Sequence, residues 1–187
     1  MKITPLIAVL LAGAAVSAQA QTYTVEPTHT YPSFEVGHMG ISVFRGKFTK
    51  TKGTVVLNRA AKTGTVDIHI DPASIDFGHE KLEAHVKNAD MLDVAKYPDI
   101  TYKGKVAFAG DAPATITGDF TMMGVTRPLT LTVTSFKCIE HPMMKREVCG
   151  ADASGEFKRS DFGLKYGLPR HGDNVKLAIQ IEAIKAD

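Results

Sequence analysis

Residues 175–182 read VKLAIQIE, with an apolar side chain at every second position from the first to the seventh. Lys176, Gln180 and Glu182 occupy positions between them. A period of two directs one set of side chains to a buried face and the other set to solvent. This segment therefore predicts a β-strand that is buried on one side only.

The same alternation recurs along most of the chain, in short segments separated by turns that contain glycine, proline or aspartate. The further segments are 23–25, 33–38, 44–48, 54–57, 66–70, 100–108, 116–122, 129–133 and 155–158. Short strands of period two are typical of an antiparallel all-β domain, here with about eight strands. The pattern leaves a closed barrel and a two-sheet sandwich both open.

Four glycines occupy the apolar phase of their strands, where they add no side chain to the core: Gly46, Gly104, Gly118 and Gly155. Glycine at such a position permits a sharp bend or the close approach of another group. One interpretation is a barrel whose interior is not filled by its own side chains. The other is a set of bulges in a normally packed core, and the sequence favours neither.

One stretch, residues 79–98, departs from the alternation. Leu82, Val86, Ala89 and Leu92 follow one another at spacings of four, three and three, which describes one face of an α-helix. The Tyr-Pro pair at the end of the stretch predicts the end of the helix, because a residue before proline disfavours the helical region. We expect a single amphipathic helix whose apolar face covers the sheet or an opening in it, as a lid or a plug.

The segment 1–20 is expected to be a secretory signal peptide. Lys2 provides a basic start, the segment Leu6–Val16 is almost wholly apolar, and the tripeptide AQA at 18–20 is a small-x-small cleavage sequence. The apolar run is too short for a stable membrane-spanning helix. The mature chain, one domain of residues 21–187, would then be an exported protein.

Cys138 and Cys149 are the two cysteines of the chain, and they flank a segment rich in turn-forming and charged residues. An exported protein meets an oxidising compartment, in which an even number of cysteines favours a disulfide. A bridge across so short a loop would contribute roughly 2–3 kcal/mol through loop-closure entropy. The alternative is a metal site that adds His141, although the paired Cys-x-x-Cys spacing and an obvious fourth ligand are absent.

Charge and motifs narrow the class of function. The 22 Lys and Arg against 20 Asp and Glu give a net charge of +2, which offers no basis for nucleic-acid binding. There is no Gly-x-Ser-x-Gly nucleophile motif, and His79 and His85 are six residues apart rather than the four of a zinc-protease helix. His38, in the apolar phase of its strand, is either a satisfied core residue or a group that orients a ligand. We expect a binding protein rather than an enzyme, with no cofactor and no metal.

Several short motifs follow one another in order across the mature chain. They are Tyr23-Thr24-Val25, His29-Thr30, Phe34-Glu35-Val36-Gly37-His38, Gly46-Lys47-Phe48, Ser74-Ile75-Asp76, the stretch 85–98, Gly118-Asp119-Phe120-Thr121, Gly124-Val125-Thr126-Arg127-Pro128 and Arg159-Ser160-Asp161-Phe162-Gly163. Together they resemble the YceI-like polyisoprenoid-binding family. The resemblance implies a lipocalin-like extended antiparallel β-barrel of about eight strands with one inserted amphipathic helix. It also implies a periplasmic location, a long isoprenoid or similar lipid in the barrel interior, and no established catalytic step.

The residues expected to contact the lipid are apolar-phase side chains of the strands and the apolar face of the helix. They are Phe34, Val36, His38, Phe44, Phe48, Ile68, Ile70, Leu82, Val86, Leu92, Ile100, Tyr102, Phe120, Met122, Leu131, Phe157, Phe162 and Ile179. A charged head group of the lipid could meet Arg127, Arg159 or Arg170, each of which could equally be a surface residue.

The expected ligand is a polyisoprenoid or other long-chain lipid, a quinone among them, held by a carrier, storage or scavenging protein. Two alternatives stay open: an enzyme that modifies its lipid, and a redox or stress accessory protein that docks on a membrane partner. We expect transient contact with a membrane or a membrane protein, no contact with nucleic acid, and either a monomer or a homodimer.

Overall fold

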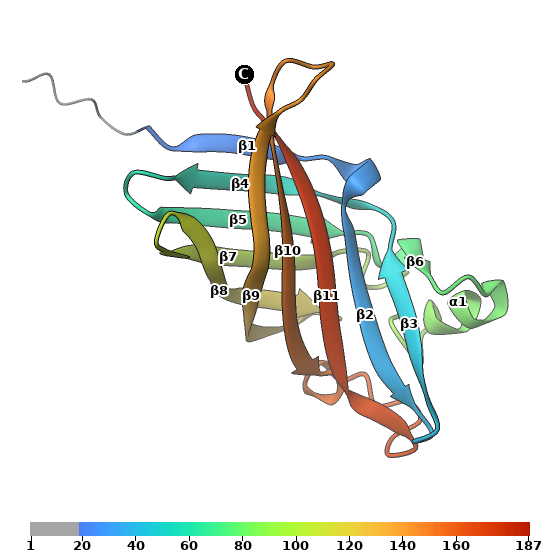
Figure 1. The fold of residues 1–187 in the computed structure, drawn as a ribbon. Coiled ribbons are helices and arrows are strands. Elements are labelled where there is room, and N and C mark those ends of the chain that lie inside the picture. Colours follow the sequence, from blue (N-terminus) through green and yellow to red (C-terminus); the bar gives the residue numbers. More distant parts are fainter. Residues whose placement is uncertain (1–18) are drawn as a thin grey trace, which may run out of the picture.

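In the computed structural model, which describes residues 19–187, eleven strands pair antiparallel into one sheet (Figure 1). Eight of them close into a barrel, in the order β1-β4-β5-β7-β8-β9-β10-β11, with β11 returning to β1. Their bounds are β1 (Gln21–Val25), β4 (Thr51–Asn58), β5 (Thr63–Ile70), β7 (Ile100–Ala109), β8 (Ala112–Met122), β9 (Val125–Glu140), β10 (Glu147–Lys158) and β11 (His171–Lys185). The predicted antiparallel barrel is confirmed, and the sandwich alternative is excluded.

The long strand β11 extends the barrel on one side. Its C-terminal part pairs with β1, and its earlier part pairs with β2 (Tyr31–His38). The sheet then continues outward through β3 (Ser42–Phe48) and β6 (Ile75–Asp76). In Figure 1 these three strands prolong one wall of the barrel toward the helix α1.

The helix α1 (Glu80–Val86) begins at a turn that is fixed by side chains. His79 caps its first turn, because Nδ1 of His79 accepts a hydrogen bond from the backbone N–H of Leu82 at 3.2 Å. Oε1 of Glu83 accepts the backbone N–H groups of Phe77 and His79, both at 3.0 Å. These bonds hold the chain as it passes from β6 into the helix.

The helix ends earlier than its apolar spacing predicts. After Val86 the chain turns back: the N–H of Leu92 donates to the carbonyl of Val86 at 3.0 Å, and Asp93 has a φ of 45°, outside the helical region. The predicted helical continuation through Ala89 and Leu92 is therefore wrong. Leu92 is nevertheless only 5% exposed, because the turn packs its side chain against the barrel.

Three short 3-10 helices complete the regular structure of residues 19–187: η1 (Pro27–His29), η2 (Pro72–Ser74) and η3 (Arg159–Phe162). None of the helices in this part of the chain has the length and apolar character needed to cross a bilayer. The expected signal peptide falls almost entirely on residues 1–18, outside the described residues.

Two expectations about β9 and β10 need correction. The cysteines do not border a loop, because β9 and β10 extend through them and leave only residues 141–146 as a turn. Pro128, which precedes the predicted segment 129–133, lies inside β9, opposite Asp119 of β8. A proline is tolerated there because β10 pairs with β9 only from Thr132 onward, so one edge of the strand needs no donor.

The apolar-phase glycines make room for the protein's own atoms. A Cβ atom on Gly46 would lie 2.7 Å from the ring of Phe34 and 2.8 Å from the ring of Phe77. A Cβ atom on Gly118 would lie 2.1 Å from the carbonyl oxygen of Lys103 on the neighbouring strand. Glycine at these positions therefore lets other atoms of the protein pack directly against the backbone. The packed atoms are aromatic side chains at Gly46 and the backbone of the neighbouring strand at Gly118.

Candidate ligand cavity

The barrel encloses a cavity of about 270 Å³. Its wall is built from side chains of every strand except β1, together with side chains of α1 and of the connection between β10 and β11. The alternation of the strands explains its chemistry, because the residues that point inward are the apolar set of each strand. A hydrocarbon guest has no polar groups that would lose hydrogen bonds in such a cavity.

Sixteen of the eighteen contact residues predicted from the sequence line this cavity. The predicted residues that line the cavity are Phe34, Val36, Phe44, Phe48, Ile68, Ile70, Leu82, Val86, Leu92, Ile100, Tyr102, Phe120, Met122, Leu131, Phe157 and Ile179. Contact of these side chains with a lipid stays a prediction.

Two predicted contact residues are not part of the wall. Phe162 lies in η3, beyond the last alternating position of β10, and its ring packs behind the wall against those of Phe120 and Phe157, with centroids 5.2 and 5.3 Å away. His38 lies at the end of β2, where its ring contacts the rings of Phe44 at 4.2 Å and His171 at 5.0 Å. Both side chains support wall residues instead of facing the cavity.

Other wall residues were missed for different reasons. Val66 and Leu177 lie in the apolar phase of their strands, so the period-two pattern alone could have placed them inside. Phe77 comes from the turn before α1, and its ring packs edge-on against Phe34 at a centroid distance of 5.6 Å. No periodic signal marks such a residue, because only the folded turn brings it over the cavity.

The polar groups of the wall are few. Among the described residues that line it there is no serine, cysteine, aspartate or glutamate. The hydroxyl of Tyr102 donates toward the carbonyls of Ile116 and Leu129 at 2.9 and 3.0 Å, and burial raises the pKa of Tyr102 to about 12. The hydroxyl of Thr51 is buried and has no hydrogen-bond partner.

Three further polar wall residues come from α1, from the connection between β10 and β11, and from the start of β11. The ring of His85 on α1 lies 4.9 Å from the ring of Tyr166 on that connection, and His171 follows at the start of β11. Tyr166 lines the cavity and is also 47% exposed, so the wall reaches the protein surface here.

The three candidate arginines have different environments. Arg127 and Arg170 are exposed at the surface. Arg159 is 5% exposed and lines the cavity, at the point where β10 passes into η3. The sequence could not rank these residues, because a single arginine carries no pattern that reports its burial.

A model of the YceI-like domain family matches residues 23–183. The chain belongs to the YceI-like domain family. It is 30% identical over 172 residues to Protein YceI of Escherichia coli O17:K52:H18. The aligned region covers 90% of each of the two chains. The family expected from the sequence motifs is therefore confirmed.

Two solved structures resemble this YceI-like domain in fold. Burkholderia cenocepacia BcnA matches with a TM-score of 0.68 at 23% identity, over 85% of this chain and 99% of that chain. A polyisoprenoid binding domain from Saccharophagus degradans matches with a TM-score of 0.66 at 13% identity, over 89% of this chain and 99% of that chain. At these identities the likeness establishes the fold.

The YceI-like barrel holds a second, smaller cavity of about 70 Å³ toward the disulfide. Val66, Ile116 and Ile181 belong to the walls of both cavities. Tyr23 and Cys149 are among the residues that line only the smaller one. The interior therefore continues from the large cavity toward the end of the barrel at which β10 begins.

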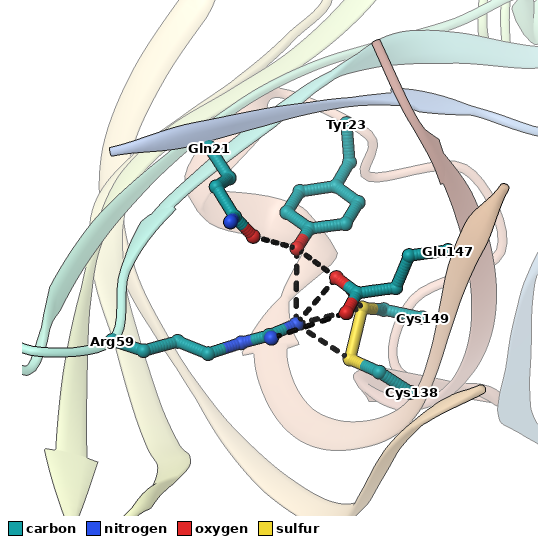
Figure 2. Close-up of a disulfide and its surroundings, with 6 residues drawn as sticks. All are labelled: Gln21, Tyr23, Arg59, Cys138, Glu147 and Cys149. Atoms are coloured by element: carbon teal, nitrogen blue, oxygen red, sulfur yellow. Dashed lines mark hydrogen bonds and ion pairs between the residues drawn. A yellow bond between two sulfur atoms is a disulfide. The ribbon is translucent and has the colours of Figure 1, made fainter. Parts of the chain in front are cut away.

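The predicted disulfide between Cys138 and Cys149 is present and joins directly opposed residues of β9 and β10. Since both sulfurs are used in the bond, the metal site that would have needed them is not formed. Figure 2 shows that the guanidinium of Arg59 lies against the bridge, with Nη2 at 3.0 Å from Sγ of Cys138 and 3.4 Å from Sγ of Cys149.

Arg59 also joins a charged network at this end of the barrel. Its Nη2 donates to Oε1 of Glu147 at 2.8 Å and to the hydroxyl of Tyr23 at 2.9 Å, and that hydroxyl also contacts Glu147 (Figure 2). Arg59 lowers the pKa of Glu147, and Glu147 in turn raises the pKa of Arg59. Burial, followed by the bond to Glu147, raises the pKa of Tyr23 to about 12. This network connects β1, the turn after β4, and β10.

Proposed function

We propose that this YceI-like domain binds one long isoprenoid, or a related amphiphilic lipid such as a quinone, with the tail inside the barrel. The observation that carries the proposal is the barrel cavity with a mostly apolar wall, which reaches the surface at Tyr166. A sugar or a nucleotide would lose its water there without gaining hydrogen-bond partners. A hydrocarbon tail has no such groups to satisfy.

Burial of the tail supplies the binding free energy. Each buried methylene group contributes about 0.8 kcal/mol, so one isoprene unit contributes roughly 3–4 kcal/mol before the costs of association. The aromatic rings of Phe34, Phe48 and Phe120 offer large, rigid contact surfaces to such a tail.

In this proposal the protein acts in the periplasm as a carrier, storage or scavenging protein. The expected signal peptide would export the chain, and the disulfide is consistent with an oxidising compartment. The fold neighbour from Saccharophagus degradans is a polyisoprenoid binding domain, which supports the choice of guest. The guest is the lipid itself, and no further cofactor enters the proposal.

Lipid exchange with a membrane is proposed to occur at the turn between β2 and β3. Met39 is 54% exposed and Ile41 is 82% exposed at this turn, and exposed apolar side chains of this kind mark a contact surface. The turn and the connection between β10 and β11 lie at the same end of the molecule in Figure 1, where Lys165 and Arg170 are exposed as well. Their charge suits an anionic bilayer surface. The protein would work there as a monomer or a homodimer.

The direct test is mass spectrometry of an organic extract from natively purified protein, with extract from denatured and washed protein as the control. We expect one stoichiometric isoprenoid lipid per chain. An empty extract, together with failure of the purified protein to take up added isoprenoids, would contradict the proposal. Chemical alteration of an added lipid during incubation would favour the lipid-modifying enzyme instead.

A variant pair connects retention to the cavity. Phe48→Asp places a carboxylate in the apolar wall, so we expect loss of at least nine-tenths of the retained lipid, since a buried unpaired charge costs several kcal/mol. Ile139→Asp is the matched control, because Ile139 is exposed on the hairpin near the disulfide. Equal retention by the folded Phe48→Asp protein would place the lipid outside the cavity.

A further inference from the structure

Arg159 is the only arginine, lysine or carboxylate among the described residues that line the cavity. Its Nε donates to the carbonyl of Gly172 at 2.7 Å, and its Nη1 donates to the carbonyls of Leu164 and Tyr166 at 3.0 and 2.9 Å. These three bonds join the start of η3 to the connection between β10 and β11 and to the first residues of β11. They account for the position of the side chain, but they use only one part of the guanidinium.

The second terminal nitrogen of the guanidinium, Nη2, differs from the other two nitrogens. Nη2 is buried and has no hydrogen-bond partner. In residues 19–187, no carboxylate oxygen lies within 4.0 Å of Arg159, and the nearby Asp173 instead accepts the backbone N–H of Ser160 at 2.9 Å and its hydroxyl at 2.8 Å. A cation that is taken out of water without a partner costs several kcal/mol. Burial accordingly lowers the pKa of Arg159.

Because Arg159 lies near one end of the cavity, the two ends of the cavity differ in charge. Arg159, Tyr166 and His171 line the cavity and come from one stretch of chain, residues 159–171, and His85 of α1 contacts Tyr166. The smaller cavity is lined by apolar residues, Cys149 and Tyr23, and the large cavity adds the uncharged Tyr102, Thr30 and Thr51. An amphiphile inside this barrel therefore meets positive charge at one end only.

We propose that Arg159 forms a subsite for an oxyanion head group, a phosphate or a carboxylate, on the lipid whose tail occupies the cavity. The inference rests on the proposed function and specifies its ligand class. The head group would give Nη2 of Arg159 the direct anionic partner that it lacks among the described residues, and a positively charged head group would be rejected. Because Nη2 is enclosed, close contact requires a small shift of the wall, and half-exposed Tyr166 is the neighbour with room to move.

The test compares lipids with the same tail and different heads. Delipidated full-length mature protein is titrated with geranylgeranyl phosphate, geranylgeraniol and geranylgeranylamine, and the dissociation constants are measured by equilibrium dialysis. We expect the phosphate to bind at least tenfold more tightly than the alcohol, and the amine to bind more weakly than the alcohol. This order is measured on the unaltered chain, so it tests the proposal even if a variant fails to fold.

Substitutions then assign the preference to Arg159. In Arg159→Met, which keeps an unbranched stem but no charge, the ratio of phosphate to alcohol affinity should fall to near one. Arg159→Lys keeps the charge and loses the planar set of carbonyl bonds, so it should retain most of the ratio. Arg170→Met is the matched control, because Arg170 is exposed on the same connection and should leave the ratio unchanged.

Each outcome separates the subsite from the binding function. If none of the three lipids binds, the proposed function itself fails. If phosphate and alcohol bind equally well to the unaltered chain, lipid binding stands and the oxyanion subsite is overturned. If Arg159→Met weakens both lipids by the same factor, Arg159 only attaches the connection, and if the preference survives in Arg159→Met, another residue provides it.

Discussion

Arg59 and Arg159 lie near opposite ends of strand β10 and have opposite environments. Arg59 meets β10 at Glu147 and Cys149, where its charge is neutralised by a carboxylate at 2.8 Å. Arg159 follows the other end of the strand, is bonded to three carbonyl groups and has no carboxylate partner among the described residues. Its surroundings lower the pKa of Arg159, whereas Glu147 raises the pKa of Arg59.

The different environments of Arg59 and Arg159 indicate different roles for the two ends of the barrel. At the first end Arg59 is paired with Glu147 and with the hydroxyl of Tyr23, and it lies against the disulfide. These contacts stabilise this end of the barrel and leave neither charged group of this pair without a partner for a ligand to bind. At the other end the buried charge of Arg159 has three carbonyl partners but no carboxylate within 4.0 Å among the described residues, which is a cost in the empty protein. We infer that the first end holds the barrel closed and the second receives the ligand, and three predictions test that division.

The largest expected effect comes from removal of the disulfide. Cys138→Ala with Cys149→Ala should lower the free energy of unfolding by about 2–3 kcal/mol, because the bridge closes a short loop in the unfolded chain. Urea titration of the variant and the parent protein measures this difference. Neither cysteine lines the large cavity, so lipid retention per folded molecule should stay unchanged.

The parent protein under reducing conditions provides the control for that substitution. Added reductant should lower its unfolding midpoint toward that of the double variant, and it should leave the variant itself unaffected. Loss of lipid from the folded double variant would break the proposed division, because the disulfide end would then shape the ligand site.

A smaller effect is expected from Glu147→Gln, which leaves Arg59 without its carboxylate. Arg59 lowers the pKa of Glu147 in the folded protein, so the stabilisation is complete above the unfolded-state pKa of this group. It disappears as the pH falls through the lower, folded-state pKa. The parent should therefore exceed the variant by about 1 kcal/mol near neutral pH, with the gap closing in acid, as the pair is partly exposed.

Glu140→Gln on the same hairpin is the matched control, because the ion pair of Glu140 with Lys145 is long, at 4.0 Å, and exposed. Its stability should follow that of the parent at every pH. Urea midpoints of the parent and of Glu147→Gln are measured across the acid range. A difference in stability that stays constant with pH would contradict the role given to the Glu147 carboxylate.

The sequence predicted what depends on local periodicity. Alternation along β5, β7, β8 and β11 identified Ile68, Tyr102, Phe120 and Ile179 as inward-facing, and they line the cavity. Strand direction and the pleat decide that outcome, and neither needs distant contacts. The helix was located but made too long, because its apolar spacing continues into a turn that also buries Leu92.

Features that depend on tertiary contacts could not be predicted from the sequence. The bond between Tyr23 and Glu147 joins residues 124 positions apart, and Arg59 reaches them from a third segment. Arg159 resembled Arg127 and Arg170 until η3 turned it inward. The separation of the two ends is therefore a property of the closed barrel, since it arises where strands that are remote in sequence finish side by side.

The smallest expected effect tests whether the ligand site continues toward the disulfide end. Val66 lines both cavities, so Val66→Phe should narrow the passage between them. A longer tail would then lose the burial of at least one methylene group, about 0.8 kcal/mol, which is roughly a fourfold loss of affinity. Equilibrium dialysis with geranylgeranyl phosphate and with farnesyl phosphate, which is one isoprene unit shorter, would show the loss for the longer tail only.

Val55→Phe provides the comparison, because Val55 lies opposite Val66 on β4 and lines only the smaller cavity. If both tails end before that cavity, Val55→Phe should change neither affinity, and the disulfide end is purely structural. If Val55→Phe weakens the longer tail as much as Val66→Phe does, the tail extends into the smaller cavity. The division between the two ends would then apply to the charged groups alone, with the hydrocarbon interior shared along the barrel.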